Sequence, residues 1–101
     1  LDLRSLPPAE RGAKCQALVA EEAGTRFDLA AGPLARGLLI LLESRRHVVM
    51  FNFHHAILDH LSVLQFAREL SAAYAAFRQG GAPALAPPAL HYPDFSVWQE
   101  E

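Results

Sequence analysis

The chain has 101 residues, of which 51% are hydrophobic and 20% are charged, and its formal net charge is -2. This composition describes one compact globular unit with a modest core. The slight acidity, together with the lack of a basic stripe interleaved with aromatic residues, argues against a nucleic-acid partner.

Membrane and export signals are also missing from the sequence. The longest apolar runs, GLLILL and VVMFNF, are far too short to span a bilayer, and we see no signal-peptide pattern. The single cysteine, Cys15, has no internal partner for a disulfide, which suits a reducing compartment. We therefore expect a cytoplasmic protein. Because the chain starts without methionine and stops inside a predicted helix, we expect a piece of a longer protein, truncated at both ends.

The first predicted element is a helix from about Pro8 to Glu22. Prolines at its beginning cost no hydrogen bond, because the first amides of a helix have no partner inside it. Cys15, Leu18 and Val19 share one face at helical spacing, and Gly24 is a suitable end.

Two apolar runs follow, LARGLLILLE at 34–43 and HVVMFNF at 47–53, joined by the charged SRR. They predict an antiparallel hairpin in which both strands are substantially buried.

The second half of the chain predicts two helices. Apolar residues recur at alternating spacings of four and three after residue 60: Val63, Ala67, Leu70, Tyr74 and Phe77. This pattern predicts an amphipathic helix with one buried stripe, ended by Gly80 and Gly81. The proline-rich residues 82–90 form an extended linker, and HYPDFSVWQEE starts a last helix with Asp94 near its N-terminus. The order helix, strand, strand, helix, helix favours an α+β two-layer sandwich, with helices packed on a mostly antiparallel sheet.

The segment FNFHHAILDH, residues 51–60, gathers polar side chains where a buried strand ends. Successive strand residues face opposite sides, so one of His54 and His55 faces the interior and the other a cleft or the opposite layer. Asp59 can cap the next helix. A histidine in this place can accept a proton or orient a nucleophile, which is worth about two to four orders of magnitude in rate.

Other interpretations of this segment stay open. It can be a hydrogen-bonded polar turn between two core elements. A metal site would draw on His54, His55, Asp59, His60 and His91, but adjacent strand residues diverge and no H-x-x-x-H or C-x-x-C is present, so we expect no metal. Catalysis by Cys15 is weaker still, since this residue lies on the apolar face of a helix.

The sequence resembles a known family at several places. HHAILDH resembles the H-H-x-x-x-D-G motif of the condensation domains of nonribosomal peptide synthetases. FDLAAGPLARGLLILLESRRHVVMFNFHHAILD resembles the stretch that leads into this motif, and LSVLQFARELSAAYAAFRQG resembles the helix that follows it. The family's downstream Y-x-D-F-x-V-W block is matched by Tyr92, Asp94, Phe95, Val97 and Trp98. The resemblance covers essentially the whole chain.

The resemblance implies a fold and a reaction. The family's domain has two chloramphenicol-acetyltransferase-like subdomains with the active site in a tunnel between them, and residues 1–101 resemble part of the N-terminal one. The amine of a carrier-bound acceptor attacks the thioester of a carrier-bound donor, and an amide forms. Partner peptidyl or acyl carrier domains supply the phosphopantetheine arms, an adenylation domain is the expected neighbour, and no cofactor is bound directly. We expect the isolated chain to be inactive.

The resemblance also assigns roles to residues. His55 corresponds to the catalytic second histidine, and His54 to the first, which supports the loop. Asp59 corresponds to a structural aspartate that pairs with an arginine. We expect this arginine to lie outside residues 1–101, with Arg36 as the alternative within the chain. His60 departs from the family by replacing the motif's glycine, which adds bulk at the tunnel mouth and restricts the backbone.

Several related functions stay open because of this departure. An epimerisation domain or an ester-forming acyltransferase uses the same motif. A non-catalytic domain that recruits carriers would be a degenerate relative. A heterocyclisation domain is disfavoured, because it carries aspartate in place of the first histidine and His54 is intact.

Overall fold

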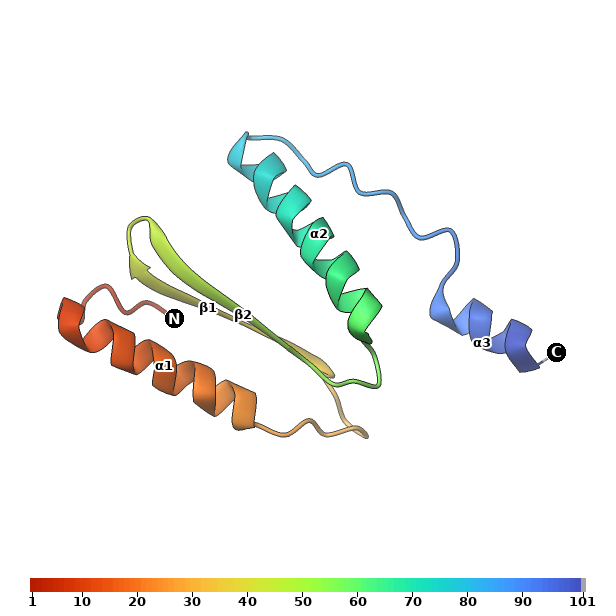
Figure 1. Cartoon of the computed structure of the whole chain (residues 1–101), viewed down its shortest axis with the longest axis horizontal. Coiled ribbons are helices and arrows are strands. Elements are labelled where there is room, and N and C mark those ends of the chain that lie inside the picture. Colours follow the sequence, from red (N-terminus) through yellow and green to blue (C-terminus); the bar gives the residue numbers. More distant parts are fainter. Residues whose placement is uncertain (101) are drawn as a thin grey trace. The chain divides into compact units, whose positions relative to one another are not determined.

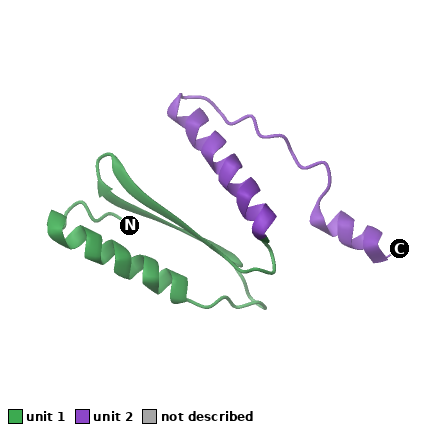
Figure 2. Ribbon diagram, viewed as in Figure 1, with its two compact units in different colours: residues 1–59 green, residues 60–101 purple. Residues whose placement is uncertain are grey.

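The computed structural model describes residues 1–100. Its elements are α1 (Pro8–Gly24), β1 (Ala35–Glu43), β2 (Arg46–Phe53), α2 (His60–Arg78) and α3 (Tyr92–Glu100) (Figure 1). The predicted order of helices and strands is confirmed. Residue 101, the last of the predicted final helix, lies outside the described residues. The chain forms two compact units, Leu1–Asp59 and His60–Glu101 (Figure 2).

Helix α1 supplies one side of the core of the first unit. Pro7 takes the position before the helix and Pro8 its first turn, where no amide is needed. The helix ends at Gly24, and Thr25 is extended. Cys15 is buried, and Leu18 and Val19 pack against the same cluster. The predicted apolar face of this helix is therefore confirmed.

The hairpin is antiparallel, as predicted, and pairs Ile40 with Val48 and Leu38 with Met50. Burial alternates along β1, with Ile40 fully buried and its neighbour Leu39 50% exposed. The expectation that both strands are substantially buried is therefore wrong. Within this unit α1 covers one face of the sheet, and the side chains of Leu39, Val49 and Phe51 alternate onto the other face.

Helix α2 ends as its glycines predict. Gly80 has a left-handed backbone with φ 77°, its N–H donates to the Phe77 carbonyl at 3.1 Å, and the Gly81 N–H donates to the Ala76 carbonyl at 3.0 Å. This pair of hydrogen bonds is a Schellman motif, in which glycine avoids the steric cost of positive φ.

The buried stripe predicted for α2 is not found. None of the described residues of this helix is buried, and Tyr74 and Phe77 are 64% and 65% exposed. The periodicity correctly predicted an amphipathic helix, but the described part of the second unit contains only helices and a linker and offers no sheet to cover the stripe.

At the start of helix α3, both the N–H and the carbonyl of His91 are hydrogen-bonded to residues of the first turn. The Phe95 N–H donates to the His91 carbonyl at 3.2 Å, and Asp94 Oδ2 accepts the His91 N–H at 3.0 Å. An acid in the third helical position that reaches back to the residue before the helix satisfies an otherwise unpaired amide. The favourable position expected for Asp94 is confirmed.

Candidate active site

His54 ties together the strand end and the turn that follows. Its N–H donates to the Leu34 carbonyl at 2.9 Å, and its own carbonyl accepts the Ile57 N–H at 3.1 Å. Its ring nitrogen Nδ1 accepts the Ala56 N–H at 3.0 Å. Because Nδ1 accepts a hydrogen bond, the proton of the neutral ring lies on Nε2.

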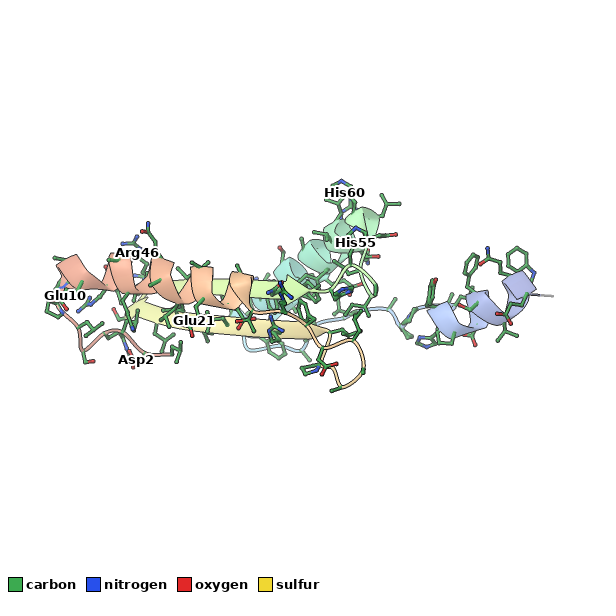
Figure 3. All side chains as sticks on the ribbon, turned by 90° about the horizontal axis from the view of Figure 1, so that it is seen from below. Asp2, Glu10, Glu21, Arg46, His55 and His60 are labelled. Carbon is green, nitrogen blue, oxygen red and sulfur yellow. The ribbon has the colours of Figure 1, made fainter. Side chains whose placement is uncertain are left out.

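His55 follows His54 and precedes Ala56 and Ile57, whose N–H groups donate to His54. It is exposed, whereas His54 is half-buried, a difference that agrees with the predicted alternation of the two side chains. Figure 3 shows His55 on the connection that follows β2, at the opposite end of this strand from Arg46. An exposed imidazole on a fixed turn can reach a bound molecule without moving the backbone.

Asp59 and His60 lie at the boundary between the two units. Asp59 is the last residue before α2, which starts at His60, so the aspartate takes the sequence position of a helix cap. The capping hydrogen bond itself stays a prediction. His60 has a helical backbone, and none of the non-glycine residues in 1–100 has positive φ. Histidine in place of the motif's glycine therefore meets no left-handed backbone here, and it differs from glycine by a bulky, polar side chain.

Arg36 is engaged at the end of α1. Its Nε donates to Glu22 Oε1 at 2.5 Å, and its Nη2 donates to the Thr25 carbonyl at 2.7 Å. The guanidinium carbon lies 3.9 Å from the centre of the Phe27 ring. Arg36 therefore forms an ion pair with Glu22, and its candidate pairing with Asp59 stays a prediction.

Phe27 connects this arginine to His54. Its ring meets the His54 ring edge to face, with centroids 5.9 Å apart and planes at 89°. Glu22, Phe27 and the contacts of Arg36 were not predicted from the sequence. No spacing rule predicts this cluster, because it joins a helix end, a loop and a strand.

The loop that carries Phe27 is shaped by Asp28. Its Oδ1 accepts the N–H groups of Ala30 at 2.9 Å and Ala31 at 3.1 Å. These amide hydrogen bonds, led by that of Ala31, hold the pKa of Asp28 below its usual value. Gly32 follows with φ 64°, a conformation that glycine adopts without strain, and the chain turns into β1.

The aromatic residues of the downstream block lie on α3. The Tyr92 and Phe95 rings are 6.2 Å apart and the Phe95 and Trp98 rings 5.8 Å apart. Tyr92 and Trp98 are 78% and 69% exposed. These residues and His60 belong to the second unit, whereas His54, His55 and Asp59 belong to the first.

Residues 1–100 contain neither of two other features that would point to a different class of site. No group of three or more His, Cys, Asp or Glu side chains in this part of the chain is arranged to hold a metal ion. None of its helices combines the length and the apolar character needed to cross a membrane.

Comparison with known proteins gives a consistent set of relatives. The family model "Condensation domain" matches residues 1–101. A linear gramicidin synthase of Brevibacillus parabrevis is 44% identical over 101 residues, which cover 100% of this chain and 2% of that protein. Chondramide synthase cmdD of Chondromyces crocatus is 41% identical over 100 residues, or 99% of this chain and 3% of that protein.

A third relative, phosphinothricin tripeptide synthetase PhsC of Streptomyces viridochromogenes, is 38% identical over 98 residues, which cover 97% of this chain and 9% of that protein. The chain therefore spans only a small part of each of these curated relatives. No solved structure matches it.

Proposed function

The chain belongs to the condensation-domain family of nonribosomal peptide synthetases, and from this premise we propose that it forms part of an amide-forming acyltransferase site in which His55 acts on the attacking amine. The observation that carries the proposal is the turn itself, where His55 is exposed between two amide hydrogen bonds made by His54. A residue whose neighbouring backbone is held in this way needs little backbone reorganisation before reaction.

In the proposed reaction the amine nitrogen of the acceptor attacks the thioester carbonyl of the donor. The carbon–nitrogen bond forms, the carbon–sulfur bond breaks, and the thiolate leaves with the electron pair. The neutral imidazole of His55 orients the amine and accepts its proton, which is then delivered to the leaving sulfur. Both substrates arrive on phosphopantetheine arms of partner carrier domains. The chain itself binds no cofactor in this scheme.

The other motif residues have supporting roles in this proposal. His54 holds the loop and Asp59 stabilises the start of α2. His60 lies near the mouth of a substrate tunnel formed with a second chloramphenicol-acetyltransferase-like subdomain. The chain is then part of the N-terminal subdomain of a cytoplasmic enzyme with an adenylation domain as neighbour. Residues 1–101 alone are expected to show no turnover, because a site between two subdomains is not preorganised by one part.

The test uses the full-length protein that contains this chain, with its two partner carriers loaded with acyl groups. Product on the downstream carrier is followed by intact-protein mass spectrometry. We expect His55→Ala to reduce turnover by about 100-fold or more. The control His47→Ala removes an exposed histidine from the same hairpin and is expected to leave turnover unchanged. Full turnover in the His55 variant would remove the catalytic assignment.

A second candidate function is carrier recruitment without chemistry. His60, in the place of the motif's glycine, is the observation that favours it. If His60→Gly condenses and the natural chain does not, this alternative is correct. The same assay separates the related enzymes, because an ester-forming relative transfers to a hydroxyl acceptor and an epimerisation domain transfers nothing and leaves the mass unchanged.

A further inference from the structure

We propose that Phe27 and Arg36 are positioning residues, which hold the His54 ring and through it the backbone around His55. We call the group formed by Glu22, Phe27, Arg36 and His54 the histidine clamp. Its catalytic consequence rests on the proposed function, whereas its effect on the turn does not. All of its members lie in the first unit.

The clamp is anchored at the end of α1. The side chains of Arg36 and Glu22 are only 21% and 24% exposed, so their ion pair is better shielded from solvent than a surface pair. Arg36 also donates to the carbonyls of Thr25 at 2.7 Å and Arg26 at 3.5 Å. Contacts in several directions fix the plane of the guanidinium, which a single ion pair does not achieve.

Phe27 transmits this fixed orientation to His54. The guanidinium lies over the ring at 3.9 Å, a distance at which a cation is attracted by the negative face of an aromatic ring. The His54 imidazole meets the same ring at 89°, the perpendicular arrangement that aromatic pairs favour. Phe27 is thus restrained by both partners and restrains them in turn.

The orientation of the His54 ring affects the backbone next to His55. The bond from the Ala56 N–H to Nδ1 forms only when the imidazole plane points its lone pair at that amide. Ala56 directly follows His55, so a tilt of the ring releases the backbone on one side of the proposed catalytic residue. Small displacements of a reacting group have large consequences, since about 1 Å can cost about 100-fold in rate.

Three substitutions in the full-length protein separate the parts of this proposal. Phe27→Leu keeps apolar volume but removes the ring. Phe27→Tyr keeps the ring and is the rescuing variant. Arg36→Lys keeps the charge but loses the planar fork. The matched control is Arg46→Lys, since Arg46 makes an exposed pair with Glu43 at 3.8 Å at the opposite end of the strand from His55 (Figure 3).

Two readouts are measured for every variant. Steady-state kinetics with loaded carriers give kcat and KM separately. Hydrogen–deuterium exchange with mass spectrometry reports the amides of Ala56 and Ile57, which donate to His54. We expect Phe27→Leu to lower kcat by about tenfold with KM unchanged and to accelerate exchange of these amides by about tenfold. Arg36→Lys lowers kcat and accelerates exchange of the same amides, but by less than Phe27→Leu does. Phe27→Tyr and Arg46→Lys keep the kcat and the exchange rates of the natural protein.

Unchanged kcat and unchanged exchange in Phe27→Leu would overturn the proposal, as would equal losses in Phe27→Leu and Phe27→Tyr. If Phe27→Leu does not fold, Arg36→Lys decides by the same two readouts. If the natural protein does not condense, the proposed function fails. Exchange at Ala56 and Ile57 then decides the clamp by itself, with faster exchange in Phe27→Leu supporting it and unchanged exchange overturning it.

Discussion

Residues 1–59 bury apolar side chains between a helix and a hairpin, whereas the described residues from 60 onward bury none. Both parts carry amphipathic helices that the sequence predicts well. In the first part, α1 packs on one face of the sheet, and Cys15 and Ile40 belong to one buried cluster. In the second, the apolar stripe of α2 stays exposed. Periodicity therefore predicts that a helix forms but not what covers it, because the cover is a tertiary property.

The motif at residues 54–60 is divided between the part with a buried core and the part without one. His54, His55 and Asp59 belong to the part with a core, and His60 belongs to the part without one. The proposed catalytic residue thus lies on a turn fixed by hydrogen bonds to Leu34, directly before β1, and within the turn itself. The residue that departs from the family lies at the start of α2, a helix in which none of the described residues is buried.

The largest expected effect is the loss of the core in the first unit. Ile40→Ala removes the one fully buried large side chain among the described residues and should lower the free energy of unfolding by about 2–5 kcal/mol. Urea denaturation of the chain measures it. Leu39→Ala is the matched control, since Leu39 is adjacent, lies on the other face of the sheet and is 50% exposed. Equal losses in the two variants would contradict the one-sided core.

The next effect lies at the boundary between the two parts. Asp59→Ala removes the side chain in the capping position before α2 and should lower the free energy of unfolding by about 1 kcal/mol. Asp59→Asn keeps an acceptor oxygen and should lose much less. In the full-length protein kcat should stay close to that of the natural enzyme. A large loss of kcat without any loss of stability would assign Asp59 a chemical role.

Local signals in the sequence account for much of the fold. Proline at the start of α1, the apolar runs of the hairpin, the glycines after α2 and Asp94 at the start of α3 each act through neighbours a few residues away. The interpretation of the hairpin failed in one respect. Continuous apolar strands usually mean burial on both faces, but burial of the second face needs a layer that the first unit does not contain.

The candidate site divides in the same way. The motif indicated His54, His55 and Asp59, because their spacing resembles a known pattern. The histidine clamp could not be predicted, since Glu22, Phe27 and Arg36 meet only after α1 ends and the chain turns back into β1. That turn depends on Asp28 and on positive φ at Gly32. The ion pair between Arg36 and Glu22 was not predicted either, because these two residues are 14 positions apart and no motif links them.

A smaller effect is expected in the second unit. Leu70→Ala truncates a residue of the α2 stripe that is 41% exposed, and alanine favours helix at least as well as leucine. The free energy of unfolding of the chain should change by no more than about 0.5 kcal/mol. The same denaturation assay measures it. A loss as large as that of Ile40→Ala would mean that the stripe is covered in solution.

The smallest effect concerns acid and the loop that carries Phe27. The folded pKa of Asp28 lies below the value of 3.8 for an unperturbed aspartate, so its ionised form stabilises the folded chain above that pH. This contribution is lost as the pH falls from 3.8 towards the folded pKa. Because the carboxylate is exposed, the change is small.

The substitution Asp28→Asn isolates this effect, because asparagine keeps the acceptor oxygen for the Ala30 and Ala31 amides but does not titrate. Between about pH 5 and about pH 3 the thermal midpoint of the substituted chain should fall less than that of the natural chain. All other carboxylates titrate alike in both. An identical fall would mean that the amides bind neutral and ionised oxygens equally, and that the loop in front of the histidine clamp is held by geometry rather than by charge.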